Sequence, residues 1–376
     1  MKLVPYRQDI FIPNKIEMGL FALCYRKMGG FYDPPGQSGI SHLLEHLLCK
    51  TFDDMREELK ALGINYNAAT SDNQIYFYFS GLTESLKEVC ERLYNRITKQ
   101  EGLCTEESFK QEKNTVLQEY GDSFNDQESG FYYNLMRKHY NYCGAIGYRP
   151  DIENFSYSDF LVRAKEFSNP SIICQVGEPF VSVSKTLKHN KQPQVKNSPQ
   201  IKFGNYDLPL ESVSKDGKTL VGLLGCKPTD IKDTQIMGFV INCINGGLEA
   251  PLYQEIRETR GLSYYSAGEA VYVGERCLPM FFASTTDENV ETLEKVYEDF
   301  FMLDGTKVIS PTRFDTCKKA YAVKKKIADI LPHSGAQTTI LGDLNPFDGV
   351  DTFTYDQVVS EYNRLMKIEN YIPVKY

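Results

Sequence analysis

The stretch GISHLLEHLLCKTFDDMREELKALG, residues 39–63, carries the most informative pattern in this 376-residue chain. Its apolar residues recur at helical spacing, and Gly63 is a typical stop signal. The sequence therefore predicts a helix over 39–63. Ile40 and the leucines that follow it share one face, which can anchor this helix in a hydrophobic core.

The opposite face of this helix offers metal ligands. At about 100° per residue, His42 and His46 lie about 40° apart, and Glu45 lies about 60° to the other side of His42. Two imidazoles can bind one ion while the carboxylate beside them holds a water, an arrangement typical of catalytic Zn²⁺ sites. His-x-x-Glu-His is the inverted form of the His-Glu-x-x-His zinc motif. The alternative is a surface helix with two ordinary histidines.

A second predicted helix, CTEESFKQEKNTVLQEYGD at 104–122, has carboxylates in an apolar stripe. Phe109, Glu112, Val116 and Glu119 are spaced so that they share one face. Carboxylates in an apolar stripe are costly to bury unless they are paired or bind metal. By itself this helix fits salt-bridged core acids equally well. Beside the histidine helix, the metal-ligand interpretation is favoured.

The charge and composition of the chain argue against several classes of protein. The net charge of −8 gives no electrostatic reason to bind nucleic acid or anionic membranes. The N-terminus lacks the apolar segment of a signal peptide, and no run of about 18 apolar residues predicts a membrane span. Ten cysteines occur without any Cys-x-x-Cys pair, as expected of reduced thiols in the cytoplasm.

Strand and helix patterns alternate irregularly along both halves of the chain, which favours an α+β fold. A polar, basic segment without apolar periodicity covers 185–202 and predicts an interdomain linker. We therefore expect an N-terminal metal-binding domain at 1–184 and a C-terminal domain at 203–376. The alternative for the linker, a nucleic-acid patch, lacks interleaved aromatic residues.

Two segments resemble one family of proteins. GGFYDPPGQSGISHLLEHLLCKT (29–51) and FKQEKNTVLQEY (109–120) are similar to the signature elements of the M16 family of inverzincins, which includes pitrilysin, insulinase and mitochondrial processing peptidase. The resemblance implies a short, two-domain member with two similar LuxS/MPP-like metallohydrolase domains, each a mainly antiparallel sheet packed with helices. It also implies His42, His46 and Glu119 as metal ligands, with Glu112 as a supporting acid.

Two further segments extend the resemblance. NAATSDNQIYFYF (67–79) is similar to the family's Asn-Ala segment, which implies that Asn67 and Ala68 bind substrate backbone. GGLEAPLYQEIRETRGLSYYSAG (246–268) is similar to a C-terminal element, which implies that Arg257 holds the peptide and Tyr264 supports the oxyanion. Without the family, both segments read as ordinary secondary structure. One departure is Leu-Cys-Lys-Thr at 48–51, where the family usually has Phe-Lys-Gly-Thr.

The resemblance implies a zinc-dependent endopeptidase that holds one Zn²⁺ per chain and uses Glu45 as general base. Peptides or unfolded segments would be cleaved in a closed chamber. Because short members of the family pair two chains, we expect a homodimer, with a heterodimer as the alternative. Two other functions compete with this one: a non-catalytic partner subunit and a peptide-binding module.

Overall fold

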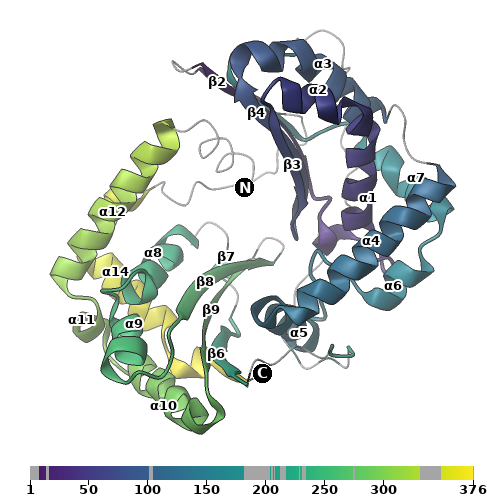
Figure 1. Cartoon of the computed structure of the whole chain (residues 1–376). Helices are drawn as coiled ribbons and strands as arrows, with labels where there is room; N and C mark the ends of the chain where they lie inside the picture. Colours follow the sequence, from purple (N-terminus) through teal and green to yellow (C-terminus); the bar gives the residue numbers. More distant parts are fainter. Residues whose placement is uncertain are drawn as a thin grey trace. The chain divides into compact units, whose positions relative to one another are not determined.

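The chain forms two compact units in the computed structural model (Figure 1). Of the residues that the structure describes, those up to 123, those from 141 to 181 and residues 328–330 belong to the first unit, and the others belong to the second. The structure describes residues 8–13, 17–100, 105–181, 204, 206, 208–211, 217–227, 229–230, 234–273, 276–330 and 349–375. The predicted linker, 185–202, lies outside these residues. None of the helices described has the length and apolar character needed to cross a membrane.

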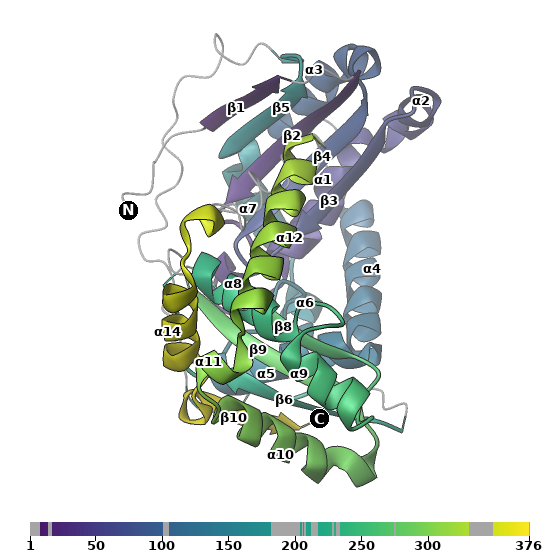
Figure 2. The ribbon, with the colours of Figure 1, turned by 90° about the vertical axis from the view of Figure 1, so that its left-hand side faces the viewer.

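The first unit combines one sheet with helices. Its strands are β1 (Gln8–Pro13), β2 (Met18–Arg26), β3 (Asn65–Thr70), β4 (Gln74–Leu82) and β5 (Ile172–Gly177). Its helices are α1 (Ile40–Cys49), α2 (Arg56–Ala61), α3 (Thr83–Lys99), α4 (Glu106–Asn125), α6 (Arg149–Asn154) and α7 (Tyr157–Ala164). The strand order is β1-β5-β2-β4-β3, antiparallel throughout except for the parallel pair β1–β5 (Figure 2).

Helix α1 is fixed to the sheet by its apolar face. Ile40, Leu43, Leu44, Leu47 and Leu48 are fully buried, and α1 packs on β3 and β4. Burial of large apolar side chains of this kind contributes about 1.5–3 kcal/mol each. The same packing leaves the histidine face of α1 directed away from the sheet core.

The prediction of a single helix over 39–63 was wrong. Helix α1 ends at Cys49, a 3₁₀ segment follows at Lys50–Met55, and Phe52 within it has a non-helical backbone. Phe52 is buried, and its ring packs edge-on against the rings of Tyr66 and Phe79. Tertiary packing of this ring overrides the local helical preference.

The second unit repeats the combination of sheet and helices. Its strands are β6 (Thr219–Gly225), β7 (Thr229–Asp230), β8 (Ser266–Val273), β9 (Arg276–Thr285) and β10 (Tyr371–Lys375). Its helices are α5 (Gln127–Tyr140), α8 (Thr234–Asn245), α9 (Pro251–Tyr253), a π-helical turn (Gln254–Thr259), α10 (Val290–Phe301), α11 (Gly305–Val308), α12 (Pro311–Ile330) and α14 (Tyr355–Leu365). All its strand pairs are antiparallel.

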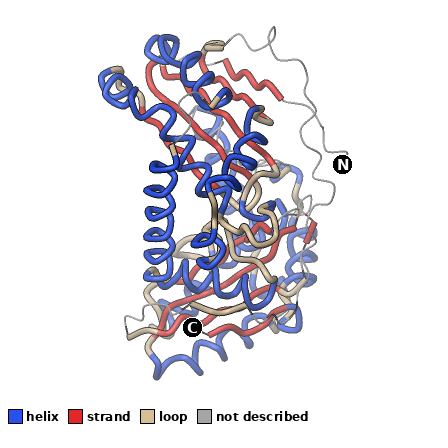
Figure 3. The backbone as a smooth tube through the Cα atoms, turned by 90° about the vertical axis from the view of Figure 1, so that its right-hand side faces the viewer, coloured by secondary structure: helices blue, strands red, loops and turns tan. Residues whose placement is uncertain are grey.

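The strands described form two sheets that share no strand, and Figure 3 colours these strands red. Helix α5 belongs to the second unit although it lies within the range 1–184. The Tyr140 hydroxyl donates to the Gly225 carbonyl at 2.7 Å, and the rings of Phe131 and Phe282 lie 6.1 Å apart. The predicted α+β fold with two similar, mainly antiparallel domains is confirmed.

Candidate metal centre

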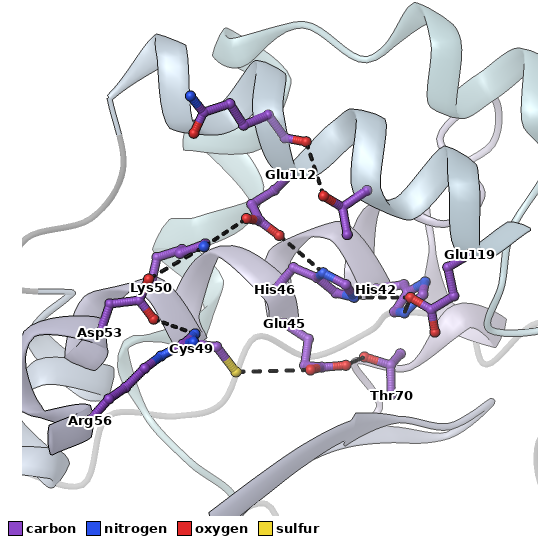
Figure 4. Close-up of polar contacts among 12 residues, drawn as sticks. His42, Glu45, His46, Cys49, Lys50, Asp53, Arg56, Thr70, Glu112 and Glu119 are labelled. Atoms are coloured by element: carbon purple, nitrogen blue, oxygen red, sulfur yellow. Dashed lines mark hydrogen bonds and ion pairs between the residues drawn. The ribbon is translucent and has the colours of Figure 1, made fainter. Parts of the chain in front are cut away.

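Helices α1 and α4 bring together the three residues expected to bind metal. The Glu119 carboxylate oxygen Oε2 lies 3.5 Å from Nε2 of His42 and 3.3 Å from Nε2 of His46 (Figure 4). One ligand atom from each residue lies within 4.8 Å of the others. Among the residues that the structure describes, this is the only cluster of three or more such side chains.

The separations fit a zinc ion. Bonds of about 2.0–2.1 Å to nitrogen and oxygen place two ligands of a tetrahedral ion about 3.4 Å apart. The distances from Glu119 to His42 and His46, 3.5 and 3.3 Å, agree with that value. Two imidazoles and one carboxylate leave the fourth position of a tetrahedron for water or substrate, as in catalytic zinc sites.

His46 is oriented by a second carboxylate. Its Nδ1 lies 3.2 Å from Oε2 of Glu112, a buried residue of α4. If Nδ1 carries the hydrogen, Nε2 keeps its lone pair for a metal. Burial lowers the pKa of His46, but the bonds to Glu119 and Glu112 and the charge of Glu45 outweigh it, so that the pKa is raised overall.

His42 is the more deeply buried imidazole of the pair. Burial lowers its pKa to about 4, although the Glu119 carboxylate acts in the opposite direction. The ring is therefore neutral at ordinary pH, which is the form that binds metal. The rings of His42 and His46 stand edge to face with their centroids 4.9 Å apart.

Glu45 lies beside this cluster without joining it. Its Oε2 accepts a hydrogen bond from the Thr70 hydroxyl at 3.2 Å, and the Cys49 thiol lies 4.0 Å from its Oε1. The side chain is buried, and burial raises its pKa to about 7 against the opposing effects of His46 and Thr70. A carboxylate with a pKa near the working pH is well suited to general base catalysis.

The start of helix α1 is held by a buried acid. Asp33 accepts hydrogen bonds from the Gly39 and Ser41 amides, at 2.7 and 3.2 Å, and from the Ser41 hydroxyl. The two amides belong to the N-cap residue and the first turn of α1, where backbone N–H groups have no partner within the helix. Arg163 lies behind Asp33, with 3.9 Å between guanidinium and carboxylate, and donates to Ser41 at 3.1 Å. The position of His42, one residue further on, depends on this cap.

The sequence argument did not identify Asp33, Thr70 or Lys50 as parts of this site. Lys50 alone had a local signal, because it follows His46 by four residues and so lies one helical turn beyond it. Asp33 and Thr70 lie in irregular or strand segments, where no periodicity indicates which residue faces α1.

Asn67 and Ala68 lie on β3, which ends the strand order of the first sheet. They pair with Tyr78 and Phe77 of β4, and Asn67 is exposed. An edge strand can accept an extended peptide as a further strand. Their role in substrate binding stays a prediction.

Arg257 and Tyr264 lie side by side in the second unit. The Arg257 guanidinium stands 4.3 Å from the centroid of the Tyr264 ring, and it also donates to the Tyr253 hydroxyl. Tyr264 is 79% exposed, which is high for an aromatic residue and leaves it accessible to a ligand. Their assignment to the substrate stays a prediction.

Comparison with known proteins confirms the resemblance to peptidase family M16. Residues 24–142 match the model of the family described as insulinase (peptidase family M16). An uncharacterized zinc protease of Rickettsia bellii is 24% identical over 316 residues, which cover 74% of this chain and 70% of that protein.

Two solved structures share the fold. A protease from Helicobacter pylori superposes with a TM-score of 0.83 at 18% identity and covers 100% of this chain and 98% of its own. An M16 peptidase inactive domain from Pseudomonas fluorescens gives a TM-score of 0.75 at 17% identity, with 100% and 96% covered. The second of these structures is described as an inactive domain, so the fold alone does not establish activity. The side chains at the candidate metal centre must be considered as well.

Proposed function

Since the chain is a zinc-protease-like protein of the M16 type, we propose that it is a zinc-dependent endopeptidase with Glu45 as general base. The observation that carries this proposal is the cluster of His42, His46 and Glu119 beside the buried carboxylate of Glu45. These four groups supply three metal ligands and one general base, which is the set that metal-assisted hydrolysis requires. The proposed stoichiometry is one Zn²⁺ per chain.

His42, His46 and Glu119 would hold the ion. When bound, Zn²⁺ lowers the pKa of a coordinated water and polarises the scissile carbonyl. Glu45 would accept the proton of the attacking water on its carboxylate and then give it to the leaving amine. The hydrogen bond from the Thr70 hydroxyl to Oε2 restrains the Glu45 carboxylate.

Extended peptide segments are the proposed substrates. They would add to the β3 edge near Asn67 and Ala68, which suits unfolded chains because their backbone N–H and C=O groups are free to pair with an edge strand. Arg257 would bind a peptide carbonyl, and Tyr264 would stabilise the oxyanion. We propose a homodimer in which each site is completed by the partner's second unit, as the family resemblance implies. Cytoplasmic location stays a prediction from cysteine usage.

Cleavage of a pool of unstructured peptides by the wild type and Glu45→Gln tests the function. Zinc is measured in both preparations. Cleavage by the wild type alone, with zinc in both, supports the peptidase and its base. Zinc in both without cleavage by either would indicate a missing partner subunit or a binding role, and peptide binding without cleavage would indicate a peptide-binding module. Absence of zinc from the wild type would indicate a non-catalytic partner subunit. Near-normal turnover by Glu45→Gln would refute the assigned base.

A further inference from the structure

Lys50 is linked to the metal centre through one intervening side chain. Its ammonium lies 2.9 Å from Oε1 of Glu112, and the other oxygen of Glu112 lies 3.2 Å from Nδ1 of His46 (Figure 4). The two oxygens of Glu112 therefore contact different partners. The carboxylate cannot turn about its terminal bond without losing one of them.

Glu112 is buried, so these contacts are not those of a solvated surface acid. A buried carboxylate needs a paired cation to remain charged at low cost. The half-exposed Lys50 supplies that cation to one oxygen of Glu112. The other oxygen of Glu112 serves as a hydrogen-bond acceptor for His46. A carboxylate acceptor held at Nδ1 favours the tautomer of His46 with its hydrogen on that nitrogen, while Nε2 faces Glu119.

Lys50 is itself held in place. Its ammonium lies 3.3 Å from Asp53, and Asp53 lies 2.6 Å from the guanidinium of Arg56. Lys50 and Asp53 belong to the 3₁₀ segment that interrupts the predicted helix, and Arg56 begins α2. Charged groups therefore form a continuous chain from Arg56 to His46.

We infer that Lys50 is a positioning residue of the zinc site, which acts on His46 through Glu112 and raises the affinity for zinc. This inference rests on the proposed zinc site. An ordinary exposed ion pair contributes little to the free energy of unfolding. Its removal would slightly change the stability of the metal-free chain and would leave the zinc affinity unchanged. Coupling to Glu112 and an effect on zinc affinity distinguish a positioning role from such a pair.

The test is the zinc dissociation constant, measured by competition with a chromophoric chelator at fixed pH and salt. Removal of a group that orients a ligand typically costs about 10–100-fold in affinity, and we expect Glu112→Gln to fall in that range. Lys50→Met, one step further away, should weaken binding about 3–10-fold. Lys50→Arg should restore most of the affinity, because it keeps the charge and a donor.

The double variant Lys50→Met/Glu112→Gln should bind zinc no more weakly than Glu112→Gln alone, because Lys50 acts through that carboxylate. Lys60→Met, an exposed lysine of α2, is the matched control and should bind like the wild type. Wild-type zinc affinity in Lys50→Met, or additive losses of zinc affinity in the double variant, would overturn this inference but leave the proposed function intact. A wild-type chain that binds no zinc would overturn both the inference and the proposed function.

Discussion

The Thr70 hydroxyl donates to Oε2 of Glu45 at 3.2 Å, and this bond joins the edge strand β3 to helix α1, which carries the two candidate metal-binding histidines. The residue proposed as general base is thereby tied to the strand proposed to hold the substrate. The same bond lowers the pKa of Glu45, in opposition to burial, which raises it to about 7. A change at Thr70 should therefore appear in the pH dependence of catalysis.

Thr70→Val should move the acid limb of kcat/KM to higher pH. Below its pKa Glu45 is protonated and cannot accept a proton, so activity falls as the pH is lowered. A lost hydrogen bond of about 0.5–1.5 kcal/mol corresponds to an upward shift of about 0.4–1.1 pH units. Thr115→Val, at an exposed position on α4, is the control. A limb that stays in place or moves to lower pH would contradict the role of Thr70.

Glu119→Gln should bind zinc at least about 100-fold more weakly than the wild type, because loss of a ligand exceeds the loss of a supporting acid. The wild type should hold one zinc per chain, and a strong chelator should abolish activity until zinc is returned. Glu107→Gln, an exposed acid on the same helix, should retain full occupancy. Elemental analysis after dialysis checks both variants, and equal zinc in both would rule out Glu119 as a ligand.

Asp33→Ala should destabilise the metal-free chain by about 3 kcal/mol. The loss combines a helix cap, about 0.5–2 kcal/mol, with the cost of removing the carboxylate that lies beside the buried Arg163 guanidinium. Asp33→Asn keeps one acceptor for the first turn and should lose less. Urea unfolding measures the free energies, with Asp122→Ala, at an exposed position, as the control. A change within about 0.5 kcal/mol for Asp33→Ala would show that the cap contributes little.

Mixed inactive variants test the proposed dimer. Glu45→Gln lacks the base and Arg257→Ala lacks the proposed peptide-binding group, so each should have little activity alone. If each site combines the first unit of one chain with the second unit of another, random exchange of the two variants restores one intact site in each mixed dimer. About a quarter of wild-type activity should then return. A mixture as inactive as its components, or full activity in a strict monomer by light scattering, would refute the shared site.

The sequence by itself determined which residues could share a face. Local periodicity places His42, Glu45 and His46 together on one helix and Glu112 and Glu119 together on another, because helix geometry follows from the backbone alone. The structure brings these two faces together as expected. The resemblance to a known family supplied the pairing of the two helices, which are separated by more than fifty residues in the chain.

Only the tertiary structure decided the features that depend on contacts between distant segments. Phe52 interrupts the predicted helix because its ring packs edge-on against the rings of Tyr66 and Phe79. Asp33 caps α1, and Thr70 reaches Glu45 from a strand, although neither residue carries a periodic signal. Helix propensity is worth a few tenths of a kcal/mol per residue, whereas burial of one aromatic ring is worth about 1.5–3 kcal/mol. Where the two conflict, packing between distant segments determines the backbone.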